Sequence, residues 1–373
     1  MAEQGGSAPS DPAGVTEAWP ASGPHHAHHS LHALGAARGH LKKRALTLVG
    51  YLVAGYLIVR LIPSLEQALR SLEEVKWPWL ILAVAIEIMS ELGYVLSWRA
   101  IVDPEDVLSG EGRGERIATR VAWVQLGGGM LVPGGSLSSV GVGAWILHRF
   151  GMPTKLIAER QFNLQFLNTG IDALALIVFG VGLAIGIFPG EGKLTLTLVP
   201  AIVAAAGIAG ALLLARRGAG YAARARDAHP KTASAIEALS QSVEDTKRML
   251  THRDGLRAVV GAVGYLGFDV FVLWSAFLAL GTHPRPTFAV VLMAYIIGAL
   301  GGSIPLPAGV GAIGGMVGML ILYGVNHSPA VAAVFVYQAI GQLVPLVGGG
   351  IAYLLLRVRL GPIQQGASLE PSG

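Results

Sequence analysis

The chain has 373 residues, of which 53% are hydrophobic and only 13% are charged, and it contains no cysteine. This composition excludes a disulfide-stapled domain, a thiol nucleophile and a cysteine-ligated metal site, and it is typical of a polytopic α-helical membrane protein. The formal net charge of +4 at pH 7 is expected to reflect Lys and Arg retained on the cytoplasmic side of a membrane, not a nucleic-acid partner.

Residues 1–40 are rich in Ala, Gly, Pro, Ser and His and show no apolar periodicity, which predicts a disordered tail. The tail contains a cluster of five histidines, His25, His26, His28, His29 and His32. The tail could be a plain solvated segment or could bind a metal ion. No Cys or carboxylate stands at ligand spacing beside the histidines to support metal binding. No metal or other cofactor is therefore predicted.

Long apolar segments follow, and about 20 such residues suffice to cross the hydrocarbon core of a bilayer. Full spans are predicted at about 45–62, 77–99, 160–188, 194–215, 256–281 and 329–356. An Arg-rich cytoplasmic linker at 216–255 is expected to contain a short helix near 232–250. The membrane domain is expected to cover 41–360 and to be followed by a disordered tail at 361–373.

Two further apolar stretches, 118–132 and 136–150, are separated by "PGG". Each reaches only about 22 Å as a helix, short of a hydrocarbon core of about 30 Å. This predicts a re-entrant helical hairpin, and 287–303 with 308–323 predicts a second one. The predicted fold is thus all-α, with six full transmembrane helices and two re-entrant hairpins.

Arg and Lys residues gather near "LKKR" at 41–44, in the 99–120 loop, in the 216–255 linker and at "RVRL". The positive-inside rule then predicts a multi-pass protein of a bacterial-type cytoplasmic membrane with both termini cytoplasmic. In this topology the first hairpin opens to the cytoplasm and the second to the outside.

The two hairpin passages, "LGGGMLVPGG" and "LGGSIPLPAG", align without a gap. The matched residues are Gly127, Gly128, Pro133 and Gly135 with Gly301, Gly302, Pro307 and Gly309, and, at a slightly larger offset, Gln161 and Gln165 with Gln338 and Gln342. Because the hairpins face opposite sides, we expect an inverted repeat with halves at about 79–188 and 256–356.

Non-helical backbone at membrane depth is tolerated only where protein or a water-filled cavity surrounds it. We therefore expect the hairpin tips to line a headgroup path, with the N–H groups of each returning helix forming an anion site. The tip residues are Pro133, Gly134, Gly135, Ser136, Pro307, Gly309 and Gly311. The alternative is that these glycines only allow tight packing, as the pair Gly311 and Gly315 is spaced to do.

One helical face in the span near 160–188 is polar, and polar side chains at membrane depth are functional candidates by default. With their repeat partners, the predicted lining residues are Gln161, Gln165, Asn168, Asp172, Gln338 and Gln342. The alternative is hydrogen bonding that only holds helices together.

Glu87 and Glu91 lie one helical turn apart, and Asp269 lies within another span. Two ionised carboxylates so placed repel, so at least one is expected to be protonated or paired. All three are candidates for proton coupling. The alternatives are a neutral Glu bonded to Ser90 or a backbone carbonyl, and a buried hydrogen-bonding role for Asp269.

The passages "PGGSLSSVGVGAWILHRFGMP", "LGGSIPLPAGVGAIGG" and "VFVYQAIGQLVP" resemble the transmembrane region of lysylphosphatidylglycerol synthases, the flippase-like domain family, over roughly 45–360. The resemblance implies movement of a lipid, or a lipid-linked headgroup, between leaflets. Its partners would be membrane lipids and a membrane protein or enzyme that supplies the lipid. Nothing resembles the soluble synthase domain, so neither aminoacyl transfer nor another enzymatic activity is expected.

Two family positions differ: Gly314 stands where relatives commonly have Glu, and Gln338 follows Tyr337 where they commonly have Arg. If that pair grips a charged headgroup, this protein handles a less charged lipid or has lost transport. Two other classes stay open, a non-transporting scaffold or regulator of envelope lipid metabolism and an enzyme acting on a lipid-linked substrate. The sequence has no HExxH motif and no nucleophile elbow to support the enzyme.

Overall fold

The computed structural model describes residues 76–104, 108, 116–131, 136–190, 193–225, 233–234, 236–237, 239–244, 253–301 and 310–360, and they contain no strand. The chain divides into two compact units, Met1–Ile62 and Pro63–Gly373, and every described residue belongs to the second. The histidine-rich tail, the predicted span at 45–62 and the tail at 361–373 lie outside the described residues.

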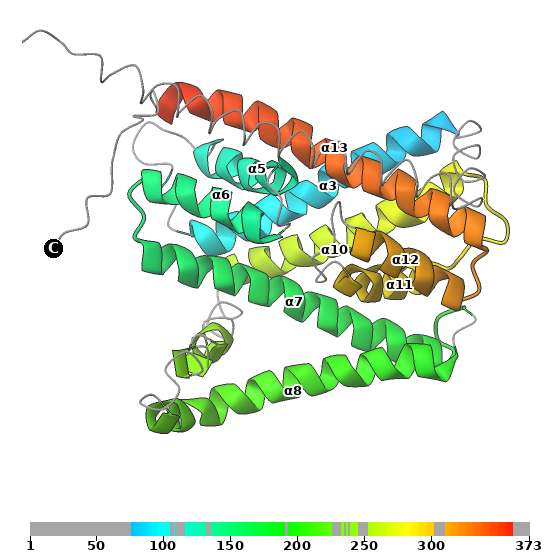
Figure 1. Cartoon of the computed structure of the whole chain (residues 1–373), viewed down its shortest axis with the longest axis horizontal. Coiled ribbons are helices and arrows are strands. Elements are labelled where there is room, and N and C mark those ends of the chain that lie inside the picture. Colours follow the sequence, from blue (N-terminus) through cyan, green and yellow to red (C-terminus); the bar gives the residue numbers. More distant parts are fainter. Residues whose placement is uncertain are drawn as a thin grey trace, which may run out of the picture. The chain divides into compact units, whose positions relative to one another are not determined.

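The described part of the chain has five helices that are long and apolar enough to cross a membrane. They are α3 (Trp77–Val102), α7 (Thr154–Ala184), α8 (Leu194–Ala225), α10 (Arg253–Ala279) and α13 (His327–Leu360), drawn in Figure 1. These helices confirm the five predicted spans that fall on described residues. The helix α8 continues beyond the predicted span, through Arg216 and Arg217 to Ala225. Ala and Arg are strong helix formers, so the helix does not stop where the apolar run stops.

Four short helices form two packed pairs. They are α5 (Arg116–Leu131) with α6 (Ser136–Arg149), and α11 (Phe288–Leu300) with α12 (Val310–Leu322). The longest of the four, α5, has 16 residues, about 24 Å at the helical rise of 1.5 Å per residue. Each of the four helices is therefore too short to cross a hydrocarbon core of about 30 Å, and the predicted breaks at 133–135 and near 304–307 lie outside the described residues.

The helices α3 and α10 lie side by side (Figure 1) and touch through glycines. A Cβ atom at Gly93 would lie 2.7 Å from the backbone nitrogen of Tyr265, and one at Gly261 would lie 2.6 Å from the carbonyl oxygen of Gly93. No side chain fits at either position without moving the backbone, so glycine sets how closely these two helices approach.

Glycine also sets the packing of the short helices. A Cβ atom at Gly127 of α5 would lie 2.6 Å from the carbonyl oxygen of Pro345 on α13. In the second pair, Gly311 faces Gly301 and Gly315 faces Gly298, both at backbone contact. The alternative interpretation, that Gly311 and Gly315 allow two helices to pack closely, is thus confirmed for this pair.

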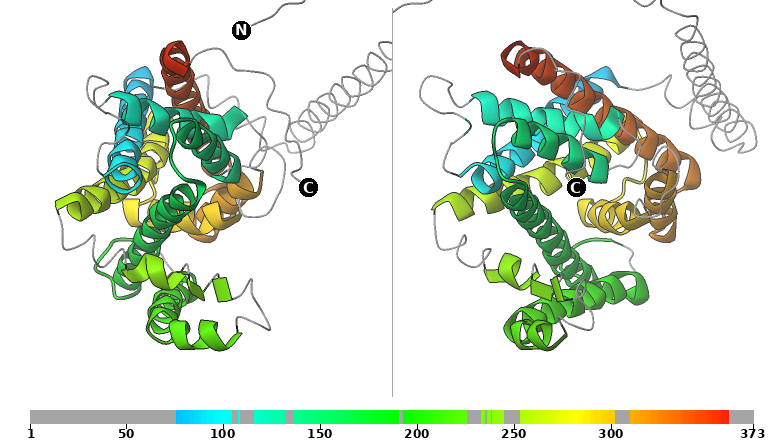
Figure 2. Two further views of the ribbon diagram at one scale, coloured as in Figure 1. Left: turned by 90° about the vertical axis from the view of Figure 1, so that its left-hand side faces the viewer. Right: turned by 60° about the vertical axis from the view of Figure 1, so that its left-hand side comes forward.

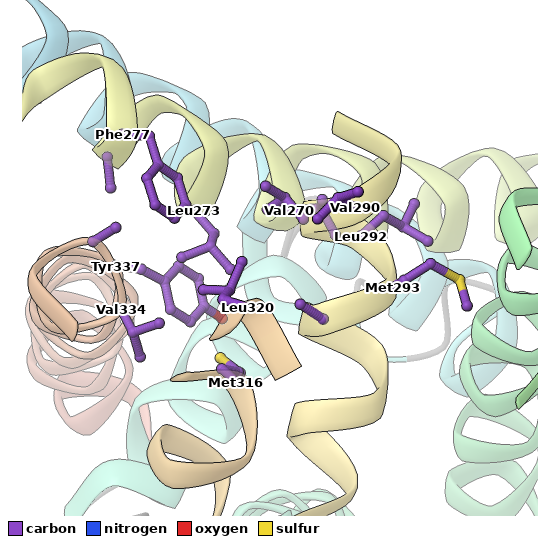
Figure 3. Packing of buried hydrophobic residues seen from close by; sticks show 14 of the residues in the cluster. Val270, Leu273, Phe277, Val290, Leu292, Met293, Met316, Leu320, Val334 and Tyr337 are labelled. Carbon is purple, nitrogen blue, oxygen red and sulfur yellow. The ribbon is translucent and has the colours of Figure 1, made fainter. Parts of the chain in front are cut away.

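Two apolar clusters fill the interior. One joins α10 to α11, α12 and α13 through residues such as Leu273, Met293 and Leu320, which Figure 3 shows from close by. The other joins α3, α5, α6 and α7 around Trp98 and Ile146. Both clusters matter for the site described next, because polar side chains at their edges are shielded from solvent.

Within the predicted linker, all described residues between 233 and 244 are helical, which confirms the short helix there. Ala233 and Ile236 are buried against Leu214 of α8, and the Ser242 hydroxyl donates to Asn163 on α7. This segment therefore lies against α7 and α8, as Figure 2 shows.

Candidate functional site

Three carboxyl groups lie inside the helix packing. Glu87 and Glu91 lie one turn apart on α3, and each is only 3% exposed. Asp269, from α10, is 6% exposed. Asp269 interacts electrostatically with Glu87, with Glu91 and with the half-buried Asp172 of α7. Glu87, Glu91 and Asp269 are called the acidic cluster below.

Two phenol groups hold Asp269. The Tyr295 hydroxyl of α11 and the Tyr337 hydroxyl of α13 both donate to the Oδ2 atom of Asp269, the second over 3.2 Å. The two rings meet edge to face, with centroids 5.9 Å apart. Tyr337 also belongs to the apolar packing around Leu320 (Figure 3). The hydrogen-bonding role predicted as one alternative for Asp269 is therefore present, with donors that come from the second short pair and the last span.

The two glutamates lack such donors. The Oε2 atoms of Glu87 and Glu91 are buried and have no hydrogen-bond partner among the described residues. Ser90, which one alternative named as a partner of a glutamate, donates to the carbonyl oxygen of Tyr265 over 2.8 Å. A serine facing across to α10 reaches the backbone of the neighbouring helix before it reaches its own helix's glutamates.

A second polar cluster joins α5 to α7. The side-chain amides of Gln125 and Gln161 exchange two hydrogen bonds of 2.9 Å each. From α3, the Trp98 indole N–H donates to Gln125 Oε1 over 2.9 Å, and the Gln125 amide donates to the Tyr94 hydroxyl over 3.0 Å. We call Gln125, Gln161, Tyr94 and Trp98 the amide network.

The short helix α6 also contributes to the amide network. The Ser139 hydroxyl donates to the carbonyl oxygen of Gln125 over 2.7 Å. At Gly143 an added Cβ would overlap the Gln125 side chain, so glycine leaves the room that this amide occupies. Sequence reasoning missed Gln125, because it stands alone among apolar residues and glycines from 121 to 131 and Ala299 stands at the matching place in the second passage.

The predicted polar face of α7 connects the two clusters. Gln161 is buried in the amide network, and Asp172 interacts with Asp269. Between them, Gln165 is exposed and Asn168 is half-buried. The short helices α6 and α11, one from each pair, both pack against α7. A polar face thus runs along a span that touches both interrupted pairs.

The repeat partners on α13 are less enclosed. Gln338 is half-buried, Gln342 is exposed, and the Gln342 amide lies 3.5 Å from Gln338 Oε1, the limit of a hydrogen bond. Gly314 is exposed, and its added Cβ would meet nothing within 4 Å.

Most predicted tip residues lie outside the described residues, namely Pro133, Gly134, Gly135, Pro307 and Gly309, as does the side chain of Ser136. Gly311 is described and packs against Gly301. Among the described residues, no three His, Cys, Asp or Glu side chains converge closely enough to hold a metal ion.

Five apolar helices of membrane-spanning length, with shielded polar groups between them, define a multi-pass helical membrane protein. The family model described as "Lysylphosphatidylglycerol synthase TM region" matches residues 47–349. The chain therefore belongs to this family, as the resemblance implied. A search of curated proteins finds no match.

Proposed function

We propose that this protein moves a membrane lipid, or a lipid-linked headgroup, between the two leaflets of a bacterial-type cytoplasmic membrane. The observation that carries the proposal is the position of α7, whose polar face lies on a span that contacts α6 of one interrupted pair and α11 of the other. A headgroup needs polar contacts through the hydrocarbon core, and a lipid-facing helix gains nothing from such residues.

The two short pairs are interpreted as re-entrant hairpins related by an inverted repeat. Their lengths support this, since neither helix of a pair reaches across the core. In transporters with this architecture, interrupted helices meet at the repeat interface and line the substrate path. The tips would then lead the headgroup to Gln165, Asn168 and Asp172, and Gln338 and Gln342 would occupy the matching positions of the second half.

The substrate proposed is a lipid whose headgroup carries little net charge. Gly314 and Gln338 replace the Glu and Arg that are common in the family, so no charge pair faces the headgroup at these positions. The amides of Gln338 and Gln342 would offer hydrogen bonds instead.

The test is lipid movement in proteoliposomes that hold the purified full chain. Fluorescent phosphatidylglycerol and a fluorescent lipid with an uncharged headgroup would be compared, with wild-type protein and with Asp172→Asn. The matched control is Asp254→Asn, which changes an exposed aspartate whose partner Arg257 lies 3.1 Å away. We expect wild-type and control protein to move the uncharged lipid faster, and Asp172→Asn to be slow.

The second candidate is a scaffold that moves no lipid. The amide network favours it, because Gln161, a predicted lining residue, holds helices together there. This candidate predicts that Asn168 and Asp172 variants lose thermal stability, and that neither they nor the wild-type protein move lipid. Well-folded wild-type protein that moves neither lipid would favour it. The proposal includes no chemical step on the lipid, so headgroup turnover by the purified protein would contradict it.

A further inference from the structure

We propose that the acidic cluster is a proton-binding site inside the membrane-spanning bundle, and that proton exchange there powers the lipid movement proposed above. The coupling rests on that proposed function, whereas the proton-binding site does not. No bond of the lipid is made or broken. In each transport cycle, one proton binds a carboxylate oxygen of the cluster in one step and leaves the same oxygen in a later step.

The first step in the argument concerns the two glutamates. An ionised carboxylate only accepts hydrogen bonds, and burying one without a donor or a cation is strongly unfavourable. Glu87 and Glu91 are each 3% exposed, and their Oε2 atoms have no partner among the described residues. With a proton bound, each side chain becomes neutral, so this conformation is a proton-loaded one.

The second step concerns the titratable groups that interact electrostatically with the cluster, from α3 itself and from α7, α10, α11 and α13. They are Tyr94 on α3, Asp172 on α7, Tyr265 on α10, Tyr295 on α11 and Tyr337 on α13. All of them are acidic or phenolic. No Lys, Arg or His salt bridge to the cluster is found in the part of the chain that the structure describes. No three of these described side chains converge on a position for a metal ion. Protons, bound one at a time, are therefore the cations that neutralise the negative charge of the cluster.

The third step links the proton to movement. One hydroxyl that donates to Asp269 belongs to Tyr295, on α11 of the second short pair. If that pair shifts, Asp269 loses a donor that stabilises its ionised form, and a proton from the glutamates is drawn to it. The half-buried Asp172, on the polar face of α7, interacts with Asp269 and offers an entry point from the proposed lipid path.

The proton site is tested by infrared spectroscopy on the purified full chain. The carbonyl stretch of a protonated carboxyl is separate from that of a carboxylate, so its intensity reports bound protons. We expect wild-type protein to show this band at pH 7, Glu87→Gln and Glu91→Gln to lose part of it, and Glu159→Gln to keep it. Glu159 is the matched control, because it is exposed and lies 3.8 Å from its partner Lys155.

Neutral Gln has the shape of a protonated Glu, so both variants are expected to unfold at the wild-type temperature. Three results would overturn the proton site. They are no protonated-carboxyl band in wild-type protein at pH 7, an undiminished band in both variants, and failure of both variants to fold, which would mean that ionised glutamates are paired.

The coupling is tested in the proteoliposomes described above, with a pH gradient imposed across the membrane. We expect the gradient to accelerate lipid movement by wild-type protein and by Glu159→Gln, but not by Glu87→Gln. Acceleration retained in Glu87→Gln, or acceleration by a sodium gradient in place of the pH gradient, would overturn the coupling. If wild-type protein moves no lipid under any gradient, the proposed function and the coupling fail together, and the infrared band still decides the proton site.

Discussion

Gln125 and Gln161 show how a single pair of side chains connects three helices. Their two reciprocal hydrogen bonds join α5 to α7, and the Trp98 indole adds α3. Gln125 is only 1% exposed and Gln161 5% exposed, so no water replaces a lost partner. Removing either amide leaves the other buried with unpaired polar atoms.

We expect Gln125→Ala and Gln161→Ala each to destabilise the protein by about 1–3 kcal/mol, the usual cost of a buried polar group that loses its partner. The double variant should cost less than the sum of the two, because the second substitution removes a group that is already unpaired. Thermal unfolding in detergent measures this. Gln165→Ala, at the exposed position one turn away, is the control and should change stability by less than about 0.5 kcal/mol. Strict additivity of the two single effects would contradict the network.

Asp269 provides a second prediction for single residues. Tyr337→Phe removes the hydroxyl that donates to Oδ2 over 3.2 Å while keeping the ring in its apolar packing. We expect a loss of about 1 kcal/mol in unfolding free energy, and almost no loss when Tyr337→Phe is added to Asp269→Asn. A loss of equal size in both backgrounds would show that the hydroxyl acts elsewhere.

At the scale of helices, glycines decide which pairs come close. The contacts of α3 with α10, of α5 with α13 and of α11 with α12 all place a glycine against the backbone of the partner helix. Close backbone approach gives dispersion contact where lipid offers no hydrophobic driving force between helices. The helix α8 differs, since only 11% of its apolar window is buried in the described structure.

This difference gives a matched pair of substitutions. Gly93→Ala on α3 would place a methyl group 2.7 Å from the Tyr265 backbone nitrogen, whereas Gly207→Ala on α8 meets nothing within 4 Å. We expect the first to destabilise the protein by about 1–3 kcal/mol through overpacking. The second should be neutral or stabilising by up to about 1 kcal/mol, because alanine favours a helix over glycine. Unfolding in detergent compares them, and equal effects would contradict the close contact of α3 with α10.

At the scale of the whole molecule, substrate choice is proposed to depend on two packed helices of the second half. Gly314 lies on α12 and Gln338 on α13, and these helices pack together. Restoring the charged residues that are common in the family is therefore a test of the lipid selected. The structure offers room at Gly314, whose Cβ has no neighbour within 4 Å, and none at Gly315, which faces the Gly298 backbone.

We expect Gly314→Glu combined with Gln338→Arg to fold and to shift lipid movement toward fluorescent phosphatidylglycerol and away from the uncharged lipid. The control, Gly315→Glu combined with Gln338→Arg, should fold poorly, since its side chain collides with α11. Both are measured in proteoliposomes after checking thermal unfolding. A folded Gly314→Glu, Gln338→Arg protein with unchanged lipid preference would contradict the role assigned to these positions.

The sequence by itself determined the helical class, the five described spans, the four short helices and the family. These follow from local properties, because a run of about 20 apolar residues must form a helix in lipid to satisfy its own backbone, and because the apolar stretches on either side of each Pro- and Gly-rich segment are too short to span a hydrocarbon core. The helix α8 extends past the predicted span, since hydropathy marks the membrane boundary while helix propensity marks the end of the helix.

Only the tertiary structure decided which polar residues meet. The sequence placed Glu87 and Glu91 one turn apart on α3. Their electrostatic interaction with Asp269, the phenol donors to Asp269 and the hydrogen bond from Ser90 to Tyr265 depend on how α10, α11 and α13 pack. Gln125 belongs to no periodic polar face and has no polar partner in the second passage. It can bond Gln161 because Gly143 leaves space for its side chain. Partners that lie far apart in the chain are chosen by packing geometry, which composition and periodicity do not encode.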